Sequence, residues 1–183
     1  MIHNDLRFLL SQKMSKEDIL TFAKTINLYN CDKIFPFIAN GNKELSANVA
    51  HLFLNTYKET EVWLTGQVAF IINIIQTTPH EKTQRLLLSI LERLKLDATN
   101  IDIKFLDYCL NNIHSRKTAC AIRVLSIKLA YKLSVEYPEL LMELKMTLEC
   151  LDSSTLNPSV ACVKKNILRK LNTLLNDKTR VKS

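Results

Sequence analysis

One pattern of hydrophobic and polar positions recurs four times along the chain. Each copy has its marked residues at positions i, i+3, i+7 and i+11, which align in one stripe of a helix with about 3.6 residues per turn. The four stripes are Ser46, Val49, Phe53 and Tyr57; Thr83, Leu86, Ile90 and Leu94; Thr118, Ala121, Leu125 and Leu129; and Val160, Val163, Ile167 and Leu171. Successive stripes begin 37, 35 and 42 residues apart. This recurrence predicts a protein built from repeated amphipathic helices.

The pattern predicts about nine or ten helices joined by short loops. We expect them over residues 3–13, 16–29, 31–39, 44–57, 61–76, 79–96, 101–113 and 157–176, with two more between 115 and 151 that meet at Tyr137-Pro138. Ser15 and Asp18 have the spacing of a capping box at the start of the second helix. Pro36 fits the third helix only in its first turn. Gly66, inside a long apolar helix, predicts the close approach of a neighbouring helix.

Eight large apolar side chains on these helices are expected to be buried. They are Leu86, Ile90, Ile122, Leu125, Leu129, Leu144, Ile167 and Leu171. Because full burial of one such side chain is worth about 1.5 to 3 kcal/mol, these residues are the predicted core.

A period of about 35 to 45 residues made of two helices is typical of a helical solenoid, in which each hairpin buries its apolar face against its neighbours. The helix pair from Lys117-Thr118 through Tyr137-Pro138-Glu139-Leu140, together with the last helix, Asn157 to Leu175, resembles the HEAT and armadillo classes, and in particular small bacterial HEAT-like repeat proteins. The resemblance covers residues 32–175. It implies an all-α fold, a right-handed α–α superhelix of HEAT-like repeats.

The composition indicates a single soluble domain over residues 1–176, followed by a flexible basic tail over residues 177–183. The chain has 183 residues, 47% of them hydrophobic and 23% charged, and two glycines leave little material for tight turns. The longest apolar run, Val68 to Ile75, is too short to span a bilayer. The first residues lack the pattern of a secretory signal. We therefore expect a cytoplasmic protein.

No arrangement of residues in the sequence names a reaction, and no cofactor or metal is predicted. The five cysteines, at positions 31, 109, 120, 150 and 162, form no CxxC pair and are expected to be reduced and packed. A nucleophile at Cys120 with His114 as its base is disfavoured, because six residues separate them. Glu136, Glu139 and Glu143 form a candidate acid–base cluster, but Glu139 is better explained as favourable charge in the first turn of a helix.

Positive charge is concentrated at the end of the chain. Of the formal charge of +7, the segment from Lys164 to Ser183 carries +6. Its candidate partner-binding patch consists of Lys164, Lys165, Arg169 and Lys170. Such a patch can bind phosphates or an acidic protein surface, or it can be the solvated outer face that the end of a solenoid needs.

These observations predict a non-enzymatic helical-repeat scaffold, or interaction module, for a protein partner. The alternative is a nucleic-acid-binding protein that uses basic residues of the repeat helices and the C-terminal helix; an enzyme ranks third. Trp63 lies in a strongly apolar helix and is expected in the core rather than on a nucleic-acid-binding surface. The nucleic-acid hypothesis would be favoured if one concave stripe were formed by Arg85, Arg116, Lys117, Arg123, Lys164 and Lys165.

Overall fold

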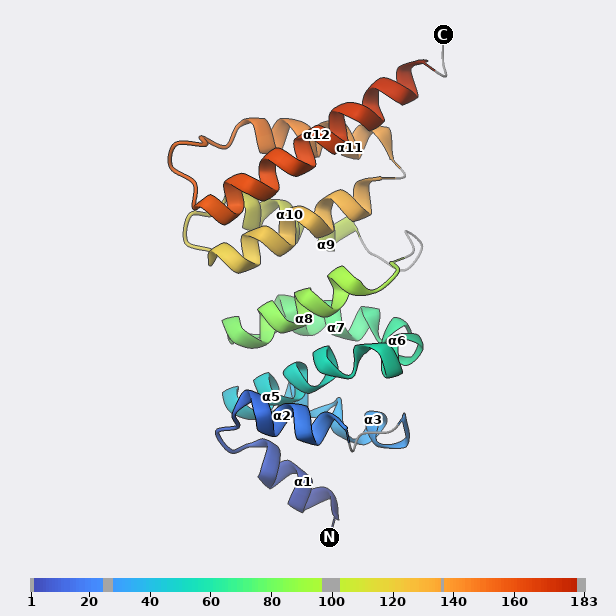
Figure 1. The fold of residues 1–183 in the computed structure, drawn as a ribbon, viewed down its shortest axis with the longest axis vertical. Helices are drawn as coiled ribbons and strands as arrows, with labels where there is room; N and C mark the ends of the chain where they lie inside the picture. Colours follow the sequence, from blue (N-terminus) through green and yellow to red (C-terminus); the bar gives the residue numbers. More distant parts are fainter. Residues whose placement is uncertain (1, 25–27, 97–102, 136, 181–183) are drawn as a thin grey trace. The chain divides into compact units, whose positions relative to one another are not determined.

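The computed structural model describes residues 2–24, 28–96, 103–135 and 137–180, and within these ranges it has twelve α-helices and no strand (Figure 1). The helices are α1 (Ile2–Leu10), α2 (Lys16–Ala23), α3 (Leu28–Ile34), α4 (Phe37–Asn40), α5 (Lys43–Asn55), α6 (Tyr57–Thr65), α7 (Val68–Thr77), α8 (Glu81–Arg93), α9 (Ile103–His114), α10 (Cys120–Ser134), α11 (Pro138–Glu149) and α12 (Pro158–Arg180). The predicted all-α fold is confirmed.

Two expected helices are each divided, so the predicted count of nine or ten is too low. In place of a helix over 31–39 the chain forms α3 and α4, with Pro36 at the N-cap position of α4. The expected helix over 61–76 is divided into α6 and α7, because Gly66 is the C-cap of α6. A Cβ atom on Gly66 would meet only the Trp63 carbonyl oxygen, at 3.4 Å. The predicted close approach of a neighbouring helix at Gly66 is therefore wrong.

The capping box at the start of α2 is confirmed. The Ser15 hydroxyl accepts a hydrogen bond from the Asp18 amide at 3.1 Å, and the Asp18 carboxylate accepts one from the Ser15 amide at 2.8 Å. These two bonds favour the ionised carboxylate and lower the pKa of Asp18. The capping box thus satisfies two backbone donors at the start of α2, those of Ser15 and Asp18, as the sequence predicted.

The chain forms two compact units, residues 1–95 and 96–183. In the first unit α5 is central and packs against α2, α4 and α8. Beside it, the rings of Phe35 and Phe53 meet edge to face, with centroids 4.8 Å apart. The Trp63 ring lies 4.9 Å from Phe35 and donates its indole N–H to Asp32 at 3.0 Å, which places Trp63 in this aromatic cluster. That both units act as one domain over residues 1–176 stays a prediction.

Two helical hairpins make the second unit. α9 pairs with α10 and α11 with α12, while α10 also packs on α12 and α9 on α11. This gives two layers, with α9 and α11 in one and α10 and α12 in the other (Figure 1). The loops that close the hairpins, residues 115–119 and 150–157, both line one cavity described below.

Seven of the eight predicted core residues are buried, and Leu125 is the exception. Leu125 is half-buried. The buried face of α10, which packs against α9 and α12, lies one residue later along the helix than predicted. That face comprises Ile122, Ser126, Leu129 and Ala130, while Ala121 is exposed. The stripe on α8 is confirmed at every position. On α5, Ser46, Val49 and Phe53 are buried, and the side chain of Tyr57 lies outside the described residues.

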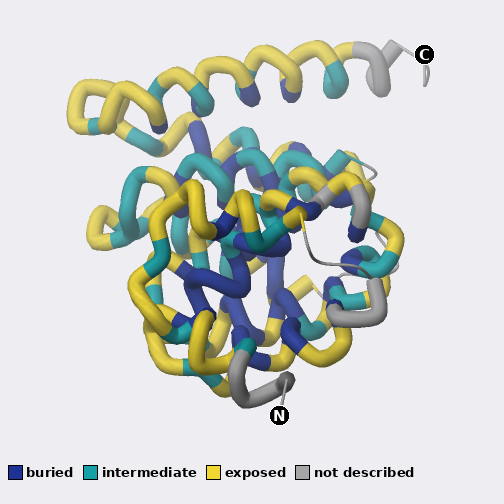
Figure 2. The backbone as a smooth tube through the Cα atoms, turned by 60° about the horizontal axis from the view of Figure 1, so that its bottom comes forward, coloured by how far each residue is buried: buried dark blue, intermediate teal, exposed yellow. Residues whose placement is uncertain are grey.

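The last helix also differs from the expected pattern. Along α12 buried and exposed positions alternate (Figure 2), and the buried stripe is Val160, Lys164, Ile167 and Leu171, with Lys164 where Val163 was predicted. α12 extends to Arg180 rather than ending near residue 176, and residues 181–183 of the expected tail lie outside the described residues. None of the helices in the described ranges is long and apolar enough to cross a membrane.

Candidate functional site

The predicted basic patch on α12 does not form one surface. Lys164 is only 8% exposed, and its ammonium donates hydrogen bonds to the Leu151 carbonyl and, at 2.9 Å, to the Ser153 hydroxyl. Including Lys164 in an exposed patch is therefore wrong, because the side chain holds the α11–α12 loop against α12. Lys165, Arg169 and Lys170 are exposed, and the Lys170 ammonium lies 5.5 Å from the centre of the Tyr131 ring.

The six cations that would define a nucleic-acid stripe are also divided between different environments. Arg123 and Lys164 are buried, each 8% exposed, and donate to backbone carbonyls. Arg116 and Lys117 are exposed in the loop between α9 and α10, and Lys165 is exposed on α12. Arg85 belongs to the first unit. Because two of the six cations are used inside the fold, the predicted single stripe is not formed.

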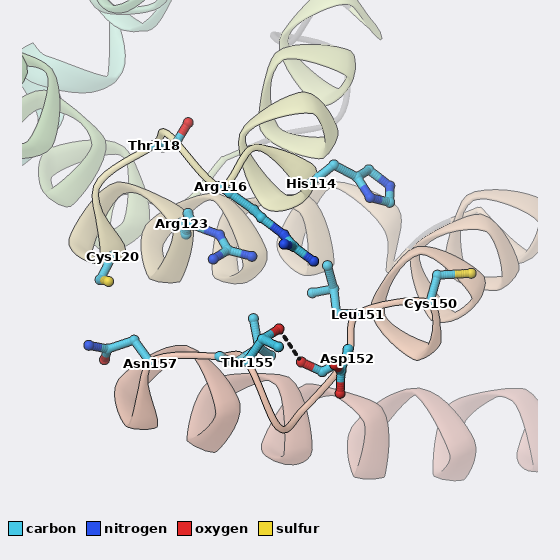
Figure 3. Close-up of a pocket in the computed structure, with 11 residues that line it drawn as sticks. His114, Arg116, Thr118, Cys120, Arg123, Cys150, Leu151, Asp152, Thr155 and Asn157 are labelled. Atoms are coloured by element: carbon cyan, nitrogen blue, oxygen red, sulfur yellow. Dashed lines mark hydrogen bonds between the residues drawn. The ribbon is translucent and has the colours of Figure 1, made fainter.

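A cavity of about 450 Å³ lies where the two hairpin loops of the second unit meet; we call it the loop cavity. It is lined by His114, Arg116, Thr118, Cys120, Arg123, Cys150, Leu151, Asp152, Thr155, Leu156 and Asn157. Figure 3 shows the guanidinium groups of Arg116 and Arg123 on one side and Leu151, Asp152 and Thr155 on the other. The lining therefore combines two arginines with the hydroxyl groups of Thr118 and Thr155 and the amide of Asn157.

Arg123 is fixed in this lining by the end of the preceding helix. Its Nε and Nη2 atoms donate to the Ile113 carbonyl oxygen at 3.2 and 2.9 Å. That carbonyl belongs to the last turn of α9, where backbone oxygens lack partners within the helix and carry partial negative charge. Two of the five N–H donors of the guanidinium are used in this way. No carboxylate of the described residues lies within ion-pair distance of Arg123.

The carboxylate in the lining is that of Asp152. It accepts hydrogen bonds from the Ser154 amide at 2.9 Å and from the Ser154 hydroxyl at 2.8 Å. These bonds, and to a lesser extent the positive charges of Arg116 and Lys164, lower the pKa of Asp152. The side chain therefore carries a negative charge at neutral pH. With Arg116 and Arg123 opposite one carboxylate, the loop cavity keeps an excess of positive charge.

Among the described residues, Cys120 and His114 do not form the nucleophile–base pair that the sequence analysis considered. Cys120 and His114 both line the loop cavity, but they stand at its opposite ends and point apart in Figure 3. Burial raises the pKa of the Cys109 thiol to about 12, and burial with the charge of Asp32 raises that of Cys31 to about 11. Cys150 and Cys162 are exposed, so the expectation that all five cysteines are packed is wrong.

A second cavity, also of about 450 Å³, runs along α11 and is more apolar; we call it the methionine groove. Its lining comprises His114, Glu139, Met142, Glu143, Met146, Thr147 and Cys150. Met142 and Met146 are 47% and 61% exposed. Glu139 and Glu143 are exposed beside them, Glu139 in the first turn of α11 as predicted. Glu136, the third member of the predicted carboxylate cluster, lies outside the described residues.

The sequence contained a signal for the methionine groove that its stripe pattern did not reveal. Met142 and Met146 are separated by four residues, as are Glu139 and Glu143, so each pair lies on one side of α11. The loop cavity had no comparable signal. Its two arginines are seven residues apart across a helix boundary, and the opposite wall comes from a loop about 30 residues later.

Among the described residues, no group of three or more His, Cys, Asp or Glu side chains could hold a metal ion. Residues 6–171 match the family model of a HEAT repeat domain. No curated protein and no solved structure matches the chain.

Proposed function

The chain belongs to the HEAT repeat domain family, and on that premise we propose that it is a non-enzymatic helical-repeat scaffold that binds a protein partner through the methionine groove. HEAT repeats commonly mediate protein interactions. The observation that supports this site is the pair of exposed methionines, Met142 and Met146, on one side of α11. Methionine side chains are flexible and polarizable, so they adapt to apolar partner surfaces.

The charges around the groove define the chemistry of the partner. Glu139 and Glu143 are exposed next to the methionines, and among the described residues neither carboxylate is engaged in an ion pair. This surface is acidic in a protein whose net charge is +7. An amphipathic helix with an apolar face flanked by lysine or arginine would match both features.

The proposal predicts how strongly the methionines contribute. Full burial of a large apolar side chain is worth about 1.5 to 3 kcal/mol, so covering the exposed fractions of both methionines is worth about 2 kcal/mol. That free energy corresponds to roughly a 30-fold change in Kd. We expect Met142→Ser with Met146→Ser to weaken the complex by about that factor.

The experiment has two steps, capture and titration. The protein and its double serine variant are used as baits in nuclease-treated native extract, and each protein retained only by the wild type is purified and titrated. Lys165→Ser with Arg169→Ser is the matched control, because it makes two exposed replacements in the same unit outside the groove. A purified partner whose Kd is unchanged by the methionine replacements, or equally weakened by the control, contradicts the proposal.

A second candidate function is nucleic-acid binding through α12. Lys165, Arg169 and Asn172 are exposed at i, i+4 and i+7, away from the buried stripe of that helix, and Lys170 is exposed beside them. A row of this kind can follow a phosphate backbone without disturbing the core. The same row also suits a polar cap at the end of a repeat array, so it supports this function less strongly than the groove supports protein binding.

A further inference from the structure

We infer that the loop cavity is a binding site for the phosphate group of a small organic phosphate. The inference concerns different residues from those of the methionine groove and goes beyond the proposed protein interaction. Two features of the described residues carry it: a buried guanidinium with unused donors, and a second, exposed guanidinium in the same lining.

Arg123 has more hydrogen-bonding capacity than the fold uses. Its bonds to the Ile113 carbonyl leave three of the five N–H donors, and its side chain is 8% exposed. A buried charge is unfavourable unless an opposite charge or hydrogen-bond acceptors compensate it. The carbonyl supplies part of this compensation. An anion in the cavity would complete it, and the planar guanidinium suits two oxygens of one phosphate.

Arg116 supplies the second cation, from the loop between α9 and α10. It is exposed, lines the same cavity, and makes no hydrogen bond with the described residues. Asp152 attracts it across the cavity but is itself held by Ser154. An approaching phosphate therefore competes with one carboxylate for two guanidinium groups. The excess charge favours the dianion.

The first turn of α10 adds to the positive electrostatic potential of the loop cavity. Its N-cap residue, Ala119, makes no side-chain capping bond, and Cys120, the first residue of the helix, lines the cavity. The positive end of the dipole of this 15-residue helix thus lies beside the two arginines. Thr155 and Asn157, on the opposite wall, provide polar groups for the remainder of a ligand.

The size of the loop cavity indicates which class of ligand it can hold. A volume of about 450 Å³ falls in the range of roughly 300 to 1,000 Å³ that is usual for small-molecule sites. It has room for an organic group as well as a phosphate, and its enclosure by two loops distinguishes it from the open face of α12. A sugar phosphate or nucleoside monophosphate fits this description, whereas a polymer backbone fits it poorly.

The test is isothermal titration of the full chain with AMP and ribose 5-phosphate, each paired with adenosine or ribose. Inorganic phosphate and a 20-nucleotide single-stranded DNA are further probes. We expect at least one organic phosphate to bind with 1:1 stoichiometry and its phosphate-free partner not to bind. Arg116→Gln should weaken this binding at least tenfold. Lys117→Gln should change it less than twofold, because Lys117 is exposed in the same loop and does not line the cavity.

Arg123→Lys tests the buried donor, with circular dichroism to establish that the variant is folded. It should weaken binding at least tenfold while it keeps the charge, since an ammonium lacks the two-pronged geometry. If this variant is unfolded, the comparison of Arg116→Gln with Lys117→Gln decides alone. The inference is overturned if neither organic phosphate binds, if inorganic phosphate binds as tightly as both, or if Lys117→Gln is as harmful as Arg116→Gln. Tighter binding of the DNA that Arg116→Gln abolishes would also overturn it, in favour of nucleic acid.

Discussion

Replacing Lys164 by methionine tests whether this cation supports the fold rather than a binding surface. The side chain occupies a core-facing position of α12, is 8% exposed, and donates to the Leu151 carbonyl and the Ser153 hydroxyl. Methionine preserves an unbranched side chain of similar length, so the packing of the aliphatic stem is kept. The replacement removes both hydrogen bonds and the positive charge.

The expected loss of stability follows from these two bonds. A hydrogen bond that involves a charged group contributes about 1.5 to 3 kcal/mol. Ser153 is exposed and can bond to water instead, so its bond contributes little to the difference. Methionine also avoids the cost of burying an ammonium. We therefore expect Lys164→Met to lower the free energy of unfolding by about 1 to 3 kcal/mol, and Lys164→Glu by about 3 to 5 kcal/mol, because it places an unpaired carboxylate near a carbonyl oxygen.

Urea unfolding at neutral pH with reduced thiols measures this change. Far-ultraviolet circular dichroism reports on both units, and fluorescence of Trp63, the only tryptophan, reports on the first unit. The loss should appear in the circular dichroism transition. Lys165→Met and Lys165→Glu are the controls and should stay within about 0.5 kcal/mol of the wild type, because Lys165 is exposed. A Lys164→Met protein as stable as the wild type would refute the structural role of this lysine.

Three further measurements test the packing and the basic helix. Leu129→Ala should lower the free energy of unfolding by about 2 to 5 kcal/mol, and Leu125→Ala by about half as much, because only Leu129 is fully buried. Equal losses in urea unfolding would contradict the observed shift of the α10 stripe. Asn48→Ala should cost about 1 to 3 kcal/mol by leaving two carbonyls without their donor, and an unchanged midpoint would refute this. If α12 binds duplex DNA, a fluorescence titration will show affinity that falls with salt, with a log–log slope of about −0.9 per phosphate contact, and Lys165→Glu with Arg169→Glu will abolish it. We expect weak, non-specific binding at most near 0.1 M salt, so submicromolar selective binding lost in this variant would favour the nucleic-acid function.

The periodic apolar residues allowed the helical class and most of the core to be predicted. On α8 every position of the predicted stripe is buried, since one face of the helix meets its neighbours and periodicity alone identifies that face. On α10 the prediction shifted by one residue, because the buried arc includes the polar residues Ser126 and Arg123. A pattern of apolar residues does not predict which polar residues are buried with their hydrogen bonds satisfied.

The candidate sites were less predictable than the core, because they depend on which polar residues the fold buries and which loops it brings together. Net charge correctly identified α12 as basic, but it could not distinguish exposed Lys165 from buried Lys164, its neighbour in sequence. The loop cavity requires the α9–α10 and α11–α12 loops to meet. Their contact is a result of hairpin packing and leaves no local signature in either loop.

Polar residues that are buried or half-buried recur along the chain at a spacing similar to that of the apolar stripes. Each of the four stripe-bearing helices has one side chain near its start that donates to a carbonyl at or just beyond the end of an earlier helix. The donors and acceptors are Asn48 to Leu10 and Gln12, Gln84 to Ile75, Arg123 to Ile113, and Lys164 to Leu151. Carbonyls in the last turn of a helix lack partners within it, so each donor satisfies an acceptor that packing would otherwise leave buried and unpaired.

The chemistry of these four donors differs, although each lies in the first two turns of its helix. An amide or an ammonium can meet one or two carbonyls and still be compatible with a packed interface. A guanidinium carries a fixed fork of five N–H groups, and at Arg123 the carbonyl of Ile113 takes only two of them. On α5, α8 and α12 the donor near the helix start is thus structural, whereas on α10 the corresponding side chain, Arg123, also lines the loop cavity and has spare donors. A side chain with a shared structural role can in this way also contribute to a binding site.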